Sequence, residues 1–69
     1  MRYCEKCDNI KHDDGDTFVN IMDAAKGAMS LRNDEAVHFF INKALDTLQK
    51  KGGCSNCIST VQGFKNQLG

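Results

Sequence analysis

The sequence predicts an all-α fold, a small domain of three helices. Three segments carry apolar residues at helical spacing, at residues 17–31, 34–51 and 55–69. The chain contains no proline, and the glycine pair at 52–53 is its strongest break. A chain of 69 residues is short for more than one domain, so residues 1–69 are expected to fold as a single unit.

The first two helices are expected to form a hairpin. Asp16 or Thr17 is a suitable N-cap for the first helix, and Asn33 for the second. Gly52 can provide a left-handed cap at the end of the second helix. The expected apolar stripe of the first helix contains Phe18, Ile21, Met22, Ala25, Ala28 and Met29. That of the second contains Val37, Phe40, Ile41, Ala44, Leu45 and Leu48.

The third helix is expected over residues 55–69, with Cys57, Val61, Phe64 and Leu68 on one face. The connection near Arg32-Asn33 is about two residues long, which makes the first two helices antiparallel neighbours. At 1.5 Å per residue they are about 22 Å and about 27 Å long. The chain therefore returns to the end where it began.

Two Cys-x-x-Cys pairs carry the strongest chemical signal, Cys4 with Cys7 and Cys54 with Cys57. The helical hairpin is expected to bring the pairs together, so that four thiolates bind one metal ion and join both chain ends. Tetrahedral Zn²⁺ prefers such ligands. The sequence thus predicts one Zn²⁺ per chain; iron is less favoured but stays open, because an iron–sulfur cluster would use the same ligands.

The four cysteines resemble the binding half-sites of treble-clef zinc domains, although a helical hairpin replaces the β-hairpin of those domains. The chain is not assigned to that family. Four thiolates leave no open position on the metal, so a structural metal and no enzymatic activity are expected. A pair of disulfides, or thiol redox chemistry at Cys54 and Cys57, remains the alternative.

The remaining titratable residues near the N-terminus are expected to be solvated. Asp13, Asp14 and Asp16 do not fit the EF-hand pattern and are interpreted as an exposed acidic loop. His12 is interpreted as a loop histidine, with replacement of a cysteine ligand as the alternative.

A partner-binding surface is predicted on the second helix. Phe39 lies nearly opposite Val37 and Ile41 on the helical wheel, beside charged residues. An exposed aromatic side chain among charges can anchor a protein partner. Coverage of Phe39 by the third helix or the N-terminal loop is the alternative. The predicted contact residues are Phe39, Lys43, Asp46 and Lys50.

The composition excludes some classes of function and favours others. Nine basic and nine acidic residues give zero formal charge, which does not favour binding to a phosphate backbone. The polar N-terminus lacks the apolar region of a signal peptide, and no apolar run would span a membrane. We expect a cytoplasmic, zinc-stabilised protein-binding module that regulates a larger complex. A nucleic-acid-binding transcriptional regulator and a thiol redox or metal-sensing protein are the alternatives, and the oligomeric state stays open.

Overall fold

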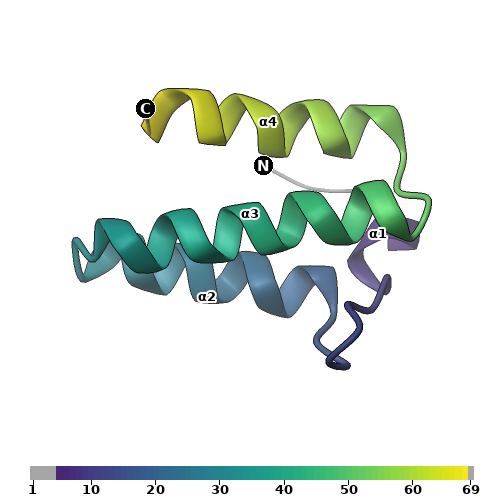
Figure 1. Cartoon of the computed structure of the whole chain (residues 1–69), viewed down its shortest axis with the longest axis horizontal. Coiled ribbons are helices and arrows are strands. Elements are labelled where there is room, and N and C mark those ends of the chain that lie inside the picture. Colours follow the sequence, from purple (N-terminus) through teal and green to yellow (C-terminus); the bar gives the residue numbers. More distant parts are fainter. Residues whose placement is uncertain (1–4, 69) are drawn as a thin grey trace.

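Four helices make up the computed structural model of this chain, which describes residues 5–68 (Figure 1). They are α1 (Glu5–Asp8), α2 (Phe18–Ser30), α3 (Asp34–Lys50) and α4 (Ser55–Leu68). No strand occurs among these residues, and the predicted all-α class is confirmed. The three long helices begin and end within a residue or so of their predicted bounds. The fourth helix, α1, is a single turn that contains Cys7, and it was not among the three predicted helices.

The caps predicted from the sequence are present. The Thr17 hydroxyl accepts a hydrogen bond from the Asn20 backbone N–H at 3.4 Å, and the Asn33 side chain accepts one from Ala36 N–H at 3.2 Å. Gly52 has a φ of 78°, in the left-handed region. The next N–H, that of Gly53, donates to the Leu48 carbonyl at 2.7 Å and closes the last turn of α3.

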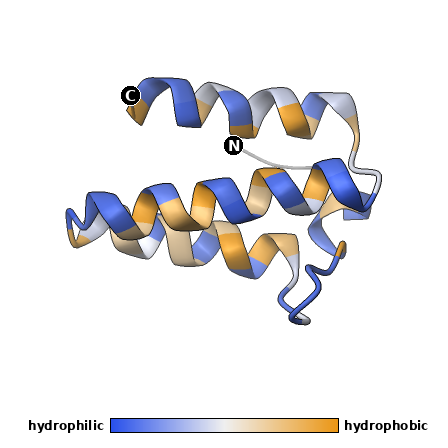
Figure 2. Ribbon diagram, viewed as in Figure 1, coloured by the Kyte–Doolittle hydropathy of each residue, from blue (hydrophilic) through white to orange (hydrophobic). Residues whose placement is uncertain are grey.

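Helix α3 is the central element, with α2 packed on one side and α4 on the other (Figure 1). Apolar residues of the three helices face one another across these contacts, and hydrophilic residues cover the outside (Figure 2). Because α3 contacts two helices, its buried residues extend over a wider part of its circumference than they would against one helix. The fully buried residues with less than 2% exposure are Cys7, Phe18, Ala25, Val37, Ala44, Thr47, Leu48 and Val61.

Two residues depart from the predicted core. Met29 was expected in the buried stripe of α2, but it is 43% exposed in the last turn of that helix. Thr47 is 1% exposed although it is polar, and its hydroxyl donates to the Lys43 carbonyl one turn earlier at 2.8 Å. This internal bond satisfies the hydroxyl and lets threonine occupy the core.

The segment between α1 and α2 folds into a tight loop, residues 11–17, which we call the acidic loop. An isolated antiparallel bridge joins Lys11 to Thr17 at its base. At its tip, Gly15 has a φ of 94° and donates its N–H to the His12 carbonyl at 2.9 Å. In the described part of the chain, no helix has both the length and the apolar character needed to cross a lipid bilayer.

Candidate metal centre and neighbouring surface

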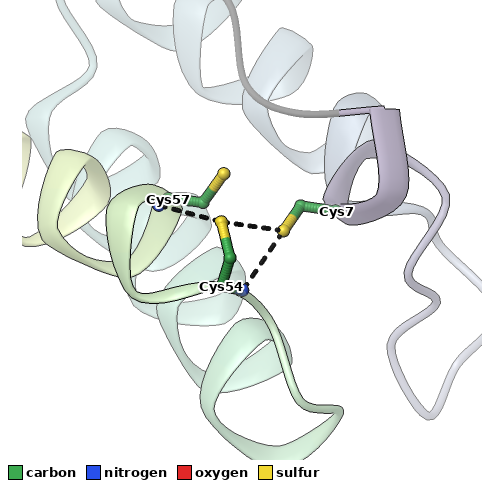
Figure 3. A group of neighbouring side chains, drawn as sticks. All are labelled: Cys7, Cys54 and Cys57. Atoms are coloured by element: carbon green, nitrogen blue, oxygen red, sulfur yellow. Dashed lines mark hydrogen bonds between the residues drawn. The ribbon is translucent and has the colours of Figure 1, made fainter.

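Cys7, Cys54 and Cys57 converge at one end of the helical bundle (Figure 3). Cys7 lies on α1, Cys54 directly precedes α4, and Cys57 lies in the first turn of α4. Their sulfur atoms all lie within 4.8 Å of one another. The predicted return of the hairpin therefore brings the second pair to Cys7, across 46 intervening residues. Cys4 lies outside the described residues.

The spacing of the sulfurs suits a metal ion better than a disulfide. Cys7 Sγ and Cys54 Sγ are 3.6 Å apart, whereas a disulfide bond is about 2.05 Å long. Four sulfurs placed about 2.3 Å from a tetrahedral ion would be about 3.8 Å from one another. The observed separation is close to that tetrahedral edge, so the three cysteines lie close enough together to hold a metal ion.

Backbone N–H groups point at two of the sulfurs. The Cys54 N–H donates to Cys7 Sγ, and the Cys57 N–H donates to Cys54 Sγ, each at 3.4 Å. The second donor belongs to the first turn of α4, where backbone N–H groups have no helical partner and the positive end of the helix dipole lies. Both contacts stabilise negative charge on sulfur, which is the form in which cysteine binds a metal.

Burial differs among the three sulfur-bearing residues. Cys7 and Cys57 are 1% and 4% exposed, whereas Cys54 is partly exposed at the end of the α3–α4 connection. Gly53 sets the path of that connection because it packs directly against Leu48. Cys54 is therefore the most exposed of the three cysteines, and the other two are shielded from water.

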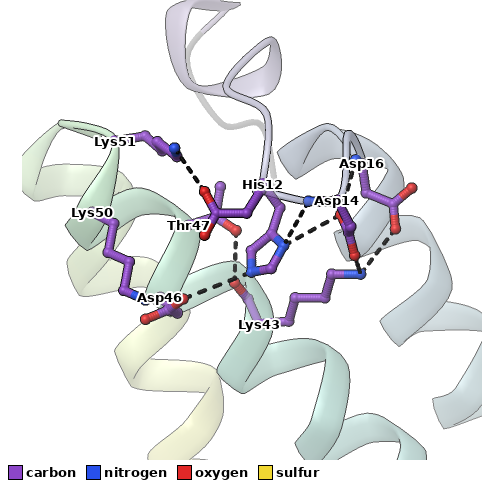
Figure 4. Close-up of polar contacts among 9 residues, drawn as sticks. His12, Asp14, Asp16, Lys43, Asp46, Thr47, Lys50 and Lys51 are labelled. Carbon is purple, nitrogen blue, oxygen red and sulfur yellow. Dashed lines mark hydrogen bonds and ion pairs between the residues drawn. The ribbon is translucent and has the colours of Figure 1, made fainter.

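The three aspartates of the acidic loop are exposed, as predicted, but they also form ion pairs with lysines at and beyond α3, which the sequence did not predict (Figure 4). Lys43 Nζ lies 2.6 Å from Asp14 Oδ2 and 2.9 Å from Asp16 Oδ2. Directly after α3, Lys51 Nζ lies 2.8 Å from Asp13 Oδ1. The sequence distance from Lys43 to its partners is more than 25 residues, so helical periodicity gives no hint of these contacts.

These ion pairs change the acidity of the groups involved. The hydrogen bond from Lys43, helped by the backbone N–H of Asp16, lowers the pKa of Asp14 to about 2. Lys51 lowers the pKa of Asp13, chiefly through its hydrogen bond. The hydrogen bonds from Lys43 to Asp14 and Asp16 raise the pKa of the lysine. The Lys43 side chain is only 13% exposed, so the loop covers much of it.

His12 belongs to this polar surface and lies apart from the sulfur cluster. Its Nδ1 is 3.2 Å from Asp14 Oδ1, and its Nε2 is 3.7 Å from Asp46 Oδ2 on α3. The imidazole therefore bridges the acidic loop and α3, and it is not one of the residues grouped around the sulfurs. Among the described residues, only the three cysteines form a group suited to metal binding.

The four residues predicted to contact a partner lie along α3 in different surroundings. Phe39 is 61% exposed, so neither the acidic loop nor α4 covers it. Its ring meets Phe40 edge-on, with centroids 5.3 Å apart. Lys43 is held by Asp14 and Asp16. Asp46 and Lys50 form a looser ion pair at 3.4 Å, in which the Lys50 side chain is largely exposed and that of Asp46 is partly exposed. The partner-binding role of these four residues stays a prediction.

An open depression of about 370 Å³ adjoins Phe39. Its lining residues are His12, Asp14, Phe39, Asn42 and Lys43. The sequence suggested Phe39 and Lys43, but it did not suggest that the acidic loop would form the opposite wall. That wall depends on the ion pairs of Lys43 and on the packing of the loop.

Fold and site together define a small helical protein with a cysteine cluster able to hold a metal ion. Comparison with models of known protein families, with curated proteins and with solved structures finds no match to this chain.

Proposed function

We propose that this protein is a small cytoplasmic binding module, held together by one zinc ion, that docks a protein partner as a regulator of a larger complex. The observation that carries the proposal is the convergence of Cys7, Cys54 and Cys57 within 4.8 Å. Cys4 is proposed as the fourth ligand. It forms a Cys-x-x-Cys pair with Cys7, and the same spacing places both Cys54 and Cys57 in the cluster.

Zinc is the proposed metal because thiolates at tetrahedral spacing are its usual structural ligands. Its role in this proposal is structural, since four protein ligands leave no position for substrate or water. The metal would join α1 to the start of α4, and a short chain with a small core benefits from such a link. The cytoplasm is proposed because its reducing conditions preserve thiolates.

Elemental analysis of the purified protein, combined with its native mass, tests the metal. We expect one zinc ion per chain, and loss of that ion in the double variant Cys54→Ser/Cys57→Ser. Iron in place of zinc would overturn the identity of the metal. Metal-free protein with a measurable thiol–disulfide exchange rate would instead indicate a thiol redox protein.

The partner-binding part of the proposal is supported by Phe39. A ring that is 61% exposed beside an open depression suits an anchor point, because aromatic residues concentrate binding energy at interfaces. Asp14 and Lys43 line the same depression, and an ion pair holds them together. Such fixed charges cost a partner little reorganisation on binding.

Phe39→Ala should therefore lose the partner while the fold is retained. We expect capture of the partner by affinity purification to fall at least about tenfold, with a thermal midpoint close to that of the unmodified protein. Leu31→Ala is the matched control, since Leu31 is an 81% exposed apolar residue at the α2–α3 turn. A partner lost equally from both variants, or a lower thermal midpoint for Phe39→Ala alone, would contradict the assignment.

Nucleic-acid binding is the alternative function. Asn42, Gln49 and Lys50 are exposed on α3, but Lys43 and Lys51 are each paired with aspartates of the acidic loop, whose carboxylates would repel phosphate. A mobility shift of DNA or RNA that weakens with added salt would favour this alternative. Absence of a shift at low salt would eliminate it.

A further inference from the structure

We infer that the metal centre is a site of oxidation by hydroperoxides, at which Cys54 is attacked first and Cys7 then forms a disulfide with it. The inference rests on the proposed function, because it describes how the proposed zinc site would be regulated. It follows from three properties of the cluster: unequal exposure, the helix start at Cys54, and the distance between sulfurs.

Exposure makes Cys54 the point of entry. A hydroperoxide must reach a sulfur atom, and Cys54 is partly exposed whereas Cys7 and Cys57 are 1% and 4% exposed. Cys54 also directly precedes α4, and its sulfur accepts the Cys57 N–H at 3.4 Å. Reactive cysteines are typically partly exposed thiolates at helix starts, where the dipole and N–H groups favour the charged sulfur.

Cys7 is close enough to Cys54 to be the second partner. Its sulfur lies 3.6 Å from that of Cys54, and the backbone N–H of Cys54 also donates to it. A shortening of about 1.5 Å would bring the two sulfurs to bonding distance. Because Cys7 is buried beside Cys54, it is positioned to react with an oxidised Cys54 before a thiol from solution can do so.

The chemistry needs one hydroperoxide, for which hydrogen peroxide is the simplest example. The Cys54 thiolate attacks one peroxide oxygen; the O–O bond breaks, a sulfenic acid forms, and hydroxide leaves. The Cys7 thiolate then attacks the Cys54 sulfur, an S–S bond forms, and the sulfenic hydroxyl leaves as water after taking up a proton. Two electrons pass from the two sulfurs to the peroxide. A second proton, drawn like the first from the solvent, converts the hydroxide released from the peroxide into water.

The choice of disulfide decides what happens to the fold. A Cys7–Cys54 disulfide removes two metal ligands, so zinc leaves, yet it links α1 covalently to the start of α4 across 47 positions of sequence. A Cys54–Cys57 disulfide would lie within one turn and would leave α1 without a link. Oxidation through Cys7 therefore exchanges a metal link for a covalent one and keeps the helices in place.

The test uses the zinc-loaded protein of residues 1–69 and hydrogen peroxide. Zinc release is followed with a chromogenic chelator, helix content by circular dichroism, and the disulfide by peptide mapping without reduction. We expect release of one zinc ion per chain, retained helical dichroism, and Cys7–Cys54 as the first disulfide. In Cys7→Ser, dimedone should trap a sulfenic acid on Cys54 at least about tenfold more than on Cys57.

Cys57→Ser is the matched control, because it keeps both reacting sulfurs and should still form the Cys7–Cys54 disulfide. If Cys7→Ser does not fold, the peptide map of the unmodified protein decides alone. A first disulfide between Cys54 and Cys57 would overturn the inference, as would first oxidation at a buried cysteine. Zinc that stays bound in the presence of peroxide would also overturn the inference, but it would leave the proposed function intact. A protein that never binds zinc would contradict both the inference and the proposed function.

Discussion

At the α2–α3 turn, a single residue holds an unfavourable backbone conformation. Arg32 has a φ of 56°, in the left-handed region that glycine occupies most readily. With this conformation, the Arg32 N–H reaches the Met29 carbonyl and the Asn33 N–H reaches the Ala28 carbonyl, both at 3.0 Å. These bonds complete the last turn of α2, so the strain at Arg32 is the cost of a tight connection.

Arg32→Gly should stabilise the protein. A left-handed conformation costs a non-glycine residue about 1–2 kcal/mol, and the greater freedom of glycine in the unfolded chain offsets part of the gain. We expect the free energy of unfolding in urea to rise by up to about 1 kcal/mol. Arg32→Ala keeps the Cβ atom and should show no such rise. An equal gain in both variants would show that the arginine side chain, and not the backbone, is responsible.

Gly53 is required for a different reason. Its φ is not positive, so the constraint is steric: Leu48 leaves no space for a side chain at this position. A Cβ atom there would lie 2.6 Å from Leu48 Cδ2 and 3.0 Å from Leu48 Cα. Leu48 is fully buried, so it cannot move aside easily. Because Gly53 directly precedes Cys54, any shift of the backbone would also displace a proposed ligand.

Gly53→Ala should lower the free energy of unfolding by about 1–3 kcal/mol, the usual cost of overpacking. The same variant should bind zinc more weakly, as measured by competition with a chromogenic chelator. Gly63→Ala is the control of opposite sign, because nothing lies within 4 Å of its Cβ position and glycine weakens a helix interior. A Gly53→Ala protein as stable as the unmodified one would show that the α3–α4 connection can relax.

At the scale of helices and loops, the sequence predicted what depends on neighbours along the chain. Thr17, Asn33 and Gly52 act as caps, as predicted, because capping requires only the adjacent backbone. Met29 was misplaced because the helical wheel identifies a face but not whether another element covers the last turn. The docking of the acidic loop was missed because its partner Lys43 is distant in sequence and its aspartates carry no periodicity.

The acidic loop should stay attached to α3 well into the acid range. Asp14 has its pKa lowered to about 2 from an ordinary value of 3.8, mainly by Lys43. A lowered pKa in the folded state stabilises the protein above pH 3.8, and the contribution is lost as the pH falls towards 2. The Asp14 carboxyl carbon should therefore still show the carboxylate chemical shift in ¹³C NMR at about pH 3, where a carboxyl group of ordinary pKa is mostly protonated, while the chain remains folded.

The same measurement on Lys43→Met provides the comparison. Without the ammonium group, the Asp14 titration should move upwards towards its ordinary range, since the principal cause of the lowered pKa is gone. In the unmodified protein, added salt should raise the pKa of Asp14 towards its ordinary value, because Asp14 is partly exposed and its attraction to Lys43 is screened. An unchanged titration in Lys43→Met would mean that the backbone N–H of Asp16 determines the acidity of Asp14.

For the molecule as a whole, the centre at Cys7, Cys54 and Cys57 could be predicted because it follows from two helix lengths and a short turn. The partial exposure of Cys54 could not be predicted, because it depends on the path of the α3–α4 connection around Leu48. Likewise, the exposure of Phe39 depends on where the acidic loop docks. The lengths of the helices and of the turn between them thus bring the cysteines together, and tertiary packing decides which residues remain accessible to solvent.

If zinc holds this fold together, the stability of the whole molecule depends on the concentration of free zinc. A ligand that binds only the folded state adds RT ln(1 + [L]/Kd) to the free energy of unfolding. For one ion per chain, each tenfold increase in free zinc above Kd should add about 1.4 kcal/mol. Urea unfolding in a series of zinc buffers measures this change in the free energy of unfolding per tenfold change in free zinc. Two ions per chain would double the change.

Magnesium buffers are the control for this experiment, because thiolates bind zinc far better than a hard oxygen-seeking cation. Cys54→Ser/Cys57→Ser should also show no dependence on free zinc, since it lacks two of the proposed ligands. A stability that stays constant over several decades of free zinc in the unmodified protein would mean that the packing of α2, α3 and α4 is sufficient for folding. In that case the fold would form without metal, and metal binding at the cysteine cluster would not be required for folding.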